Sequence, residues 1–119
     1  MIKENHRVVD VAISIMFKFV EKNYNLSKTI IQSGSSDWYI TRIRIFMVIF
    51  MYNDLYLTTS IIASKLNKSS ITILNYVKGR RDSDKPSFAT IMRKSPVTRE
   101  EYFKFRDDLR KMIWENQTK

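Results

Sequence analysis

The scarcity of chain-breaking residues constrains this sequence more than any other feature. Only two glycines and two prolines occur in 119 residues, and 44% of the residues are hydrophobic. Such a chain favours long regular elements with few tight turns. Its length is that of one ordinary domain, and its apolar content is enough for one self-standing core. We therefore expect a single folded domain over residues 1–119.

Helical periodicity begins near the start of the chain. Between residues 7 and 23, polar side chains recur at spacings of four, four and three within an apolar run, at Asp10, Ser14, Lys18 and Glu21. This spacing predicts a heavily buried helix with one narrow hydrated stripe. A short second helix is expected from a cap at Ser27 through Gln32 or Ser33, where Gly34 would stop it.

A longer helix is predicted from a cap in Ser36-Asp37 to about Tyr52. Residues 45–52 are β-branched and aromatic enough for a strand. However, their continuity with the cap and the lack of a hairpin partner favour a helix.

Two short helices across a tight turn are predicted over residues 57–78. Leu57-Thr58 opens the first helix and Asn67-Lys68 ends it, after which Ser69 or Ser70 caps the second. Such a pair is typical of a helix-turn-helix. Ala63, which is small and lies mid-helix, suits a close crossing of the two helices.

The last third of the chain predicts a loop and then a helix. Residues 78–97 read as a basic surface loop with a short ordered piece around residues 88–92. Thr98 and Glu101 form a T-x-x-E capping box that predicts a final helix over residues 98–115. The whole chain predicts an all-α fold of five to six helices with a central helix-turn-helix. Its aromatic core is expected to contain Phe17, Phe19, Phe46, Phe50 and Trp114.

Several function classes lack the residues they need. The chain has no cysteine and one histidine, His6, near its start, so no thiolate zinc site, histidine metal site or hydrolytic triad is expected. Gly34 and Gly79 stand alone, outside any nucleotide-binding motif. We expect no catalytic residue, no cofactor, no metal and no small-molecule substrate, and hence no enzyme.

Membrane insertion is not expected either. The longest apolar run spans residues 45–52, well short of the roughly 20 residues of a transmembrane helix. The first residues are charged and carry no small-residue cleavage site, so no signal peptide is expected. These features predict a cytoplasmic protein without a membrane partner, placed in the host cytoplasm or nucleoid if it is viral.

Positive charge is concentrated in the middle of the chain. The formal net charge is +9, and residues 42–94 hold +7 of it, from ten basic and three acidic side chains. A basic excess confined to one stretch favours a surface that binds a polyanion. A charge that merely keeps the protein soluble is the alternative.

Three motifs carry a family resemblance. They are Arg42-Ile43-Arg44 followed by apolar residues, the helix Leu57-Thr58-Thr59-Ser60-Ile61-Ile62-Ala63, and Ser69-Ser70-Ile71-Thr72-Ile73-Leu74. With them the chain resembles the C-terminal DNA-binding domain of the bacterial replication initiator DnaA, a relative of the Trp-repressor helix-turn-helix. The resemblance implies binding of double-stranded DNA. The family's acidic and histidine base readers are replaced here by Ser69 and Ser70, its first threonine by Ile71, and its ATPase module is absent.

A helix-turn-helix places the N-terminal part of its second helix in the major groove. The residues expected to face the bases are Lys68, Ser69, Ser70, Ile71, Thr72 and Asn75. Asn75 can pair with adenine through two hydrogen bonds, and Lys68 can donate to guanine or to a phosphate. Ile71 or the Thr72 methyl group can meet a thymine methyl. The structural alternatives are a serine cap, a solvated polar face and, for Ile71, a core contact.

Other basic residues are expected on the DNA backbone or in the minor groove. They are Arg42, Arg44, Lys65, Lys78, Arg80, Arg81, Arg93 and Lys94. The resemblance implies a minor-groove arginine at Arg42 and a phosphate contact at Arg44. Because residues at i and i+2 do not share a helix face, we expect one of the two to reach DNA and the other to pair internally, with Asp37 or Asp54.

The sequence thus predicts a small DNA-binding regulator of transcription or replication without ATPase activity. Its size and composition suit a phage or mobile element. The alternative is a non-enzymatic protein-interaction or structural module that kept the fold but lost base readout. That module would bind a second copy of itself or another protein through an apolar patch around Ile71, Ile73 and Tyr76. RNA binding lacks its usual aromatic residues on a basic sheet.

Overall fold

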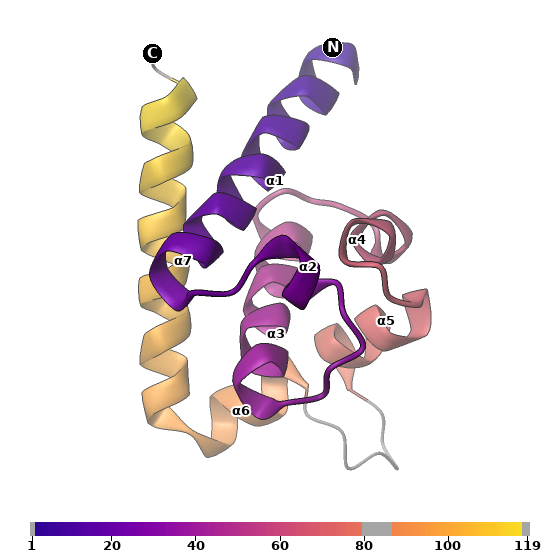
Figure 1. Cartoon of the computed structure of the whole chain (residues 1–119), viewed down its shortest axis with the longest axis vertical. Coiled ribbons are helices and arrows are strands. Elements are labelled where there is room, and N and C mark those ends of the chain that lie inside the picture. The colour runs from indigo at the N-terminus through magenta and orange to yellow at the C-terminus, as the bar shows by residue number, and fades with distance from the viewer. Residues whose placement is uncertain (1, 80–86, 118–119) are drawn as a thin grey trace.

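Helices form all the regular structure in residues 2–79 and 87–117, the parts of the chain that the computed structural model describes (Figure 1). The predicted all-α fold is confirmed. These described residues hold seven helices where five to six were expected: α1 (Ile2–Tyr24), α2 (Lys28–Ile31), α3 (Trp38–Asn53), α4 (Thr59–Leu66), α5 (Ser70–Lys78), α6 (Phe88–Lys94) and α7 (Pro96–Gln117).

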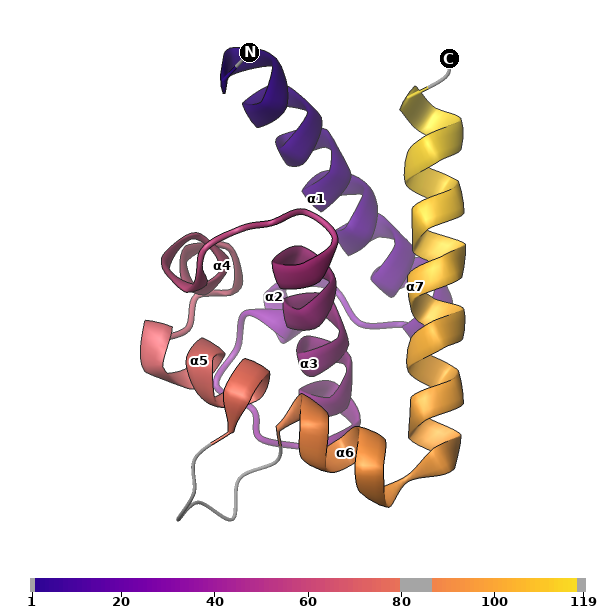
Figure 2. The ribbon, with the colours of Figure 1, turned by 180° about the vertical axis from the view of Figure 1, so that it is seen from behind.

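Helix α3 is the centre of the molecule. Ten of its sixteen residues are buried, and it contacts each of the other six helices. A helix that is apolar on every side has to be surrounded, which explains this position. Figures 1 and 2 show α7 on one side of α3 and the α4–α5 pair on the opposite side. The strand alternative for residues 45–52 is therefore excluded.

Aromatic side chains join α3 to the two long outer helices. The ring centroid of Phe105 on α7 lies 5.5 Å from Phe19 of α1 and 5.5 Å from Phe46 of α3. Tyr102, one turn earlier on α7, packs edge-to-face on Phe88 of α6 at 4.9 Å. These contacts fasten α1, α6 and α7 to α3, because aromatic pairs add to the burial of their own surface.

Helix α1 shows its predicted stripe: Asp10, Ser14, Lys18 and Glu21 are all exposed. Phe17, Phe19, Phe46 and Phe50 are core residues as expected. The expectation for Trp114 is wrong, because 66% of its surface is exposed. Trp114 lies near the C-terminal end of α7, where α7 and the start of α1 diverge (Figure 1).

The start of α7 differs from the prediction. The helix begins at Pro96, and the Ser95 hydroxyl accepts a hydrogen bond from the Thr98 backbone N–H at 3.2 Å. Ser95 therefore caps the helix, and proline occupies the first-turn position that it favours. The predicted Thr98–Glu101 capping box does not form. Helix α2 also ends earlier than expected, at Ile31 with Gln32 as its C-cap, so Gly34 does not stop it.

Helix α6 replaces part of the predicted basic loop. It extends the expected ordered piece to Phe88–Lys94 and is capped by Ser87, whose hydroxyl accepts from the Thr90 N–H at 3.3 Å. Gly79 ends α5 with a φ of +75°, which favours glycine. A Cβ at Gly79 would lie 3.0 Å from the Ser87 hydroxyl oxygen, so the end of α5 and the start of α6 approach closely.

Candidate nucleic-acid interface

Helices α4 and α5 form the predicted helix-turn-helix, and each boundary has a local cause. The Thr58 hydroxyl caps α4 by accepting from the Ile61 N–H at 3.3 Å. Asn67 ends α4 with a φ of 55°, a left-handed conformation that asparagine tolerates. The Ser69 hydroxyl then caps α5 by accepting from the Thr72 N–H at 3.1 Å. Buried Ala63 and Ile73 lie in α4 and α5, which pack on each other and on α3.

One side of α5 faces away from the protein. Ser70, Ile71, Leu74 and Lys78 are exposed, while Ile73 between them is fully buried against the core. The exposed residues recur at helical spacing and so share one face. We call this set the α5 face. Nothing else in the described residues covers it, and Figure 2 shows α5 on the outer side of the molecule.

The predicted base readers divide into two groups. Ser70 and Ile71 lie on the α5 face, and 65% of the Ile71 surface is exposed. Asn75 and Thr72 are half-buried at its margin. The Ser69 hydroxyl is occupied within the helix, because it bonds to the Thr72 hydroxyl at 2.9 Å as well as to the Thr72 N–H. The alternative of a serine cap thus holds for Ser69, whereas the alternative of a core contact fails for Ile71.

Arg44 lies in the core, not at a surface that could meet a phosphate. Its side chain is 2% exposed, and its guanidinium donates to the carbonyl oxygens of Ile31 at 2.7 Å and Ser33 at 2.8 Å. It also donates to the carbonyls of Ile30 and Ser35. The planar guanidinium can serve several acceptors at once, which suits this loop around the end of α2. Burial lowers the pKa of Arg44. The expected phosphate contact at Arg44 is therefore corrected.

Arg42 also points inward. Its guanidinium forms an ion pair with Glu101 of α7 and lies 5.1 Å from the ring centroid of Tyr39. Only 14% of its side chain is exposed, so this arginine is not positioned for a minor groove. The expected internal partners were wrong as well. Asp54 pairs with Arg110, and Asp37 caps α3 by accepting from the Tyr39 N–H.

Lys68 stands at the edge of the α5 face beside a second cation. Its ammonium group donates to the carbonyl oxygen of Ser33, the same atom that accepts from Arg44. No carboxylate shares this contact among the described residues. Partial burial and the charge of Arg44 lower the pKa of Lys68. Two cations thus share one neutral acceptor, an arrangement that an anion would stabilise.

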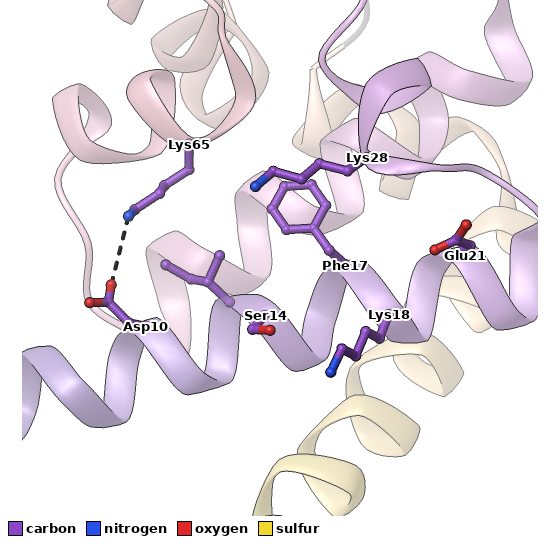
Figure 3. A pocket seen from close by; sticks show the side chains of 8 residues that line it. Asp10, Ser14, Phe17, Lys18, Glu21, Lys28 and Lys65 are labelled. Carbon is purple, nitrogen blue, oxygen red and sulfur yellow. Dashed lines mark ion pairs between the residues drawn. The ribbon is translucent and has the colours of Figure 1, made fainter.

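Lys65 faces away from α5. It reaches across to α1 and pairs with Asp10 at 3.7 Å (Figure 3). A groove of about 450 Å³ lies there, and Phe17 in its floor is covered by the Lys28 ammonium at 5.2 Å from the ring centroid. This groove carries lysines and carboxylates together, so it is not a uniformly basic surface.

The remaining predicted phosphate contacts are spread out. Lys78 is exposed at the end of the α5 face. Arg93 and Lys94 are exposed at the far end of α6, where the chain turns into α7 and away from α5 (Figure 2). None of these three forms an ion pair with any other residue in the described ranges. Arg80 and Arg81 lie outside the described residues.

Two residues of this surface were missed. Leu74 lies one turn after Ile71, and extending the helical spacing from Ile71 would have found it. Tyr56, in the connection before α4, is 86% exposed and has a φ of 57°. Nothing in the sequence pattern signals that conformation, because tyrosine rarely adopts it.

No group of three or more potential metal ligands occurs among the side chains that the structure describes, in residues 8–79 and 87–116. In the same ranges, no helix has both the length and the apolar character needed to cross a bilayer.

Comparison with known proteins gives no match: no family model, no curated protein and no solved structure is significantly similar to this chain. The resemblance to the DnaA domain therefore rests on the sequence motifs and stays a prediction.

Proposed function

We propose that this chain binds double-stranded DNA through the α5 face, as a small non-enzymatic regulator of transcription or replication. In this proposal Ser70 and Ile71 meet the base edges in the major groove, with Asn75 at the margin. Lys68 and Lys78, near the two ends of α5, contact the phosphates on either side. The protein would act in the cytoplasm, or in the host cytoplasm or nucleoid if it comes from a phage or mobile element.

The absence of acidic residues from the sequence segment that contains α5 carries the proposal. No aspartate or glutamate occurs between residues 54 and 82 of the sequence, whereas five lysines and arginines do. Helix α5 is thus an exposed helix in an acid-free segment, backed by α4 and α3. Repulsion from carboxylates would otherwise oppose the approach of phosphates.

The contact between Lys68 and Ser33 adds a second argument. In the free protein Lys68 shares its acceptor with Arg44. A phosphate beside α5 would accept a charge-assisted hydrogen bond from Lys68 and relieve the repulsion between the two cations. Arg44 would keep its four carbonyl partners and hold the Ser33 loop in place.

The test is fluorescence anisotropy with a labelled random-sequence duplex across a salt series. We expect affinity to fall steeply between about 50 and 200 mM salt, with a log–log slope of about −0.9 per phosphate contacted. Lys78→Gln should weaken binding and reduce the magnitude of the slope by about 0.9. Lys111→Gln, which removes an exposed lysine from α7 on the opposite side of α3, is the matched control and should change neither value.

Selection from a randomised pool then separates two forms of the proposal. An enriched motif would establish sequence-specific binding, and salt-dependent binding without a motif would indicate an architectural role. Absence of binding at low salt, or equal effects of Lys78→Gln and Lys111→Gln, would contradict the proposal.

A protein-interaction role is the second candidate, favoured by the apolar part of the α5 face. Ile71 and the 41%-exposed Leu74 are neighbours on this face, and exposed apolar neighbours mark contact surfaces. The apolar patch predicted around Ile71, Ile73 and Tyr76 is corrected, because Ile73 is buried and Tyr76 is half-buried. A dimer seen by light scattering and abolished by Ile71→Asp, in a protein that does not bind duplex DNA, would favour this role.

A further inference from the structure

Tyr56 is unusual among the described residues with positive φ. The other two non-glycine residues are Asn25 and Asn67, and asparagine tolerates the left-handed region. Tyr56 allows the chain to turn after α3, so that the Leu57 N–H donates to the Met51 carbonyl at 3.1 Å. Glycine or asparagine would make this turn with less strain. The backbone therefore gives no reason for a tyrosine at this position.

Packing gives no reason either. With 86% of its surface exposed, Tyr56 is the most exposed of the large hydrophobic side chains described. A large aromatic group that neither eases the backbone nor fills the core is available for a contact outside the protein. Strained residues of this kind cluster at functional sites.

The residues around Tyr56 indicate what kind of molecule it contacts. Tyr56 lines a groove of about 630 Å³ between the end of α3 and α5. Leu74 and Lys78, two members of the α5 face, form its other wall, and Thr58 and Thr59 lie at the start of α4. Besides Leu57 and Leu74, the lining supplies hydroxyl, amide and ammonium groups, and it includes no carboxylate among the described residues. Such a lining suits a sugar–phosphate backbone.

We propose that Tyr56 contacts the DNA backbone, donating a hydrogen bond from its hydroxyl to a phosphate beside the one bound by Lys78. This inference rests on the proposed binding of DNA through the α5 face. It adds a second contact on one flank of α5, opposite the flank held by Lys68. The Tyr56 ring would also cover the deoxyribose next to that phosphate.

The experiment compares Tyr56→Asn, Tyr56→Phe and Lys78→Gln in the full chain, with the labelled random-sequence duplex. Tyr56→Asn should fold at least as stably as the wild type, because asparagine accepts the left-handed conformation. It should weaken binding about five- to tenfold, the effect of one lost hydrogen bond to a phosphate. Tyr56→Phe keeps the ring and loses only the hydroxyl, so it should weaken binding by no more than Tyr56→Asn does. Trp114→Ala removes an exposed aromatic side chain from α7 as the matched control and should leave affinity unchanged.

The salt slope distinguishes the two neighbouring contacts. Tyrosine is neutral, so both Tyr56 variants should keep the wild-type slope, whereas Lys78→Gln should reduce its magnitude by about 0.9. Wild-type affinity in either Tyr56 variant would overturn this inference and leave the DNA-binding proposal standing. No binding by the wild-type protein would overturn both. If Tyr56 instead contacts a protein partner, the wild-type chain should form a complex with that partner and Tyr56→Asn should not.

Discussion

At the scale of single residues, the arginines show that the chemical type of a side chain does not determine its role. Arg42 and Arg44 lie two residues apart in an R-x-R motif that suggested contact with DNA. In the structure Arg42 links α3 to Glu101 of α7, and Arg44 holds the carbonyl groups that follow α2. Both roles depend on partners distant in sequence. Neither role could be predicted from the sequence, because the sequence does not show whether an arginine donates to a phosphate or to a group within the protein.

The role of Arg44 gives a stability prediction. Arg44→Met leaves the carbonyls of Ile31 and Ser35 without their donor, and we expect it to lower the free energy of unfolding by about 3 kcal/mol. Arg93→Met, at an exposed arginine of α6, should change that free energy by less than about 0.5 kcal/mol. Urea denaturation of both variants provides the measurement. If Arg44→Met folded normally but lost affinity for DNA, the internal role would be contradicted.

At the scale of elements, capping is the part of the fold that the sequence predicted well. Ser27, Asp37, Thr58 and Ser69 each cap the helix expected of them. Capping is a contact between residues two or three apart, so the sequence contains both partners. The start of α7 was mispredicted because two local signals compete there. Ser95-Pro96 prevails over the Thr98–Glu101 box, and Glu101 instead pairs with Arg42, which the sequence does not reveal.

The Ser95 cap gives a prediction for this element. Ser95→Ala should lower the free energy of unfolding by about 1 kcal/mol, because the Thr98 N–H loses its acceptor at the start of α7. Thr98→Ala should cost less, since the Thr98 side chain accepts only from the Ser95 hydroxyl. Thermal unfolding of the two variants compares them. A larger loss in Thr98→Ala would indicate that the predicted capping box is the one that operates.

At the scale of the whole molecule, the charge distribution predicted a basic surface more extensive than the one that the described residues form. Residues 42–94 carry a net +7, yet Arg42, Arg44, Lys65 and Lys68 all have partners within the protein. Lys78 is left on the α5 face, while Arg93 and Lys94 lie beyond it. Summing charge along the chain shows where cations occur but not which way they point. The helical order and the α5 face were predictable, whereas this division of the cations required the packed structure.

Alkaline pH should destabilise the whole molecule through its buried tyrosines. Burial, with a smaller contribution from the Asp54 carboxylate, raises the pKa of Tyr102 from 10.0 to about 12. Between these values the unfolded chain loses the phenolic proton and the folded chain keeps it. Stability is therefore fully present below pH 10 and is lost as pH rises towards 12, by up to about 1.4 kcal/mol per pH unit. Burial also raises the pKa of Tyr24 and Tyr76, which adds to the loss.

Chemical denaturation at several pH values between 10 and 12 measures this loss. Tyr102→Phe should make the decline in stability shallower, because this ring no longer carries a proton to release. Equal declines in the wild type and in Tyr102→Phe would show that Tyr102 does not retain its proton in the folded state.

The close approach of Gly79 to Ser87 has a consequence for how this chain can vary. Because the fold itself brings these two positions together, the length of peptide between them is not set by any gap it must span. Doubling that length with flexible residues would cost only about 0.6 kcal/mol of loop-closure entropy. Insertions here are thus nearly neutral for folding, and the extended peptide would start at Gly79, where α5 ends. Natural drift or a protein engineer can extend this connection and give the same scaffold new binding partners.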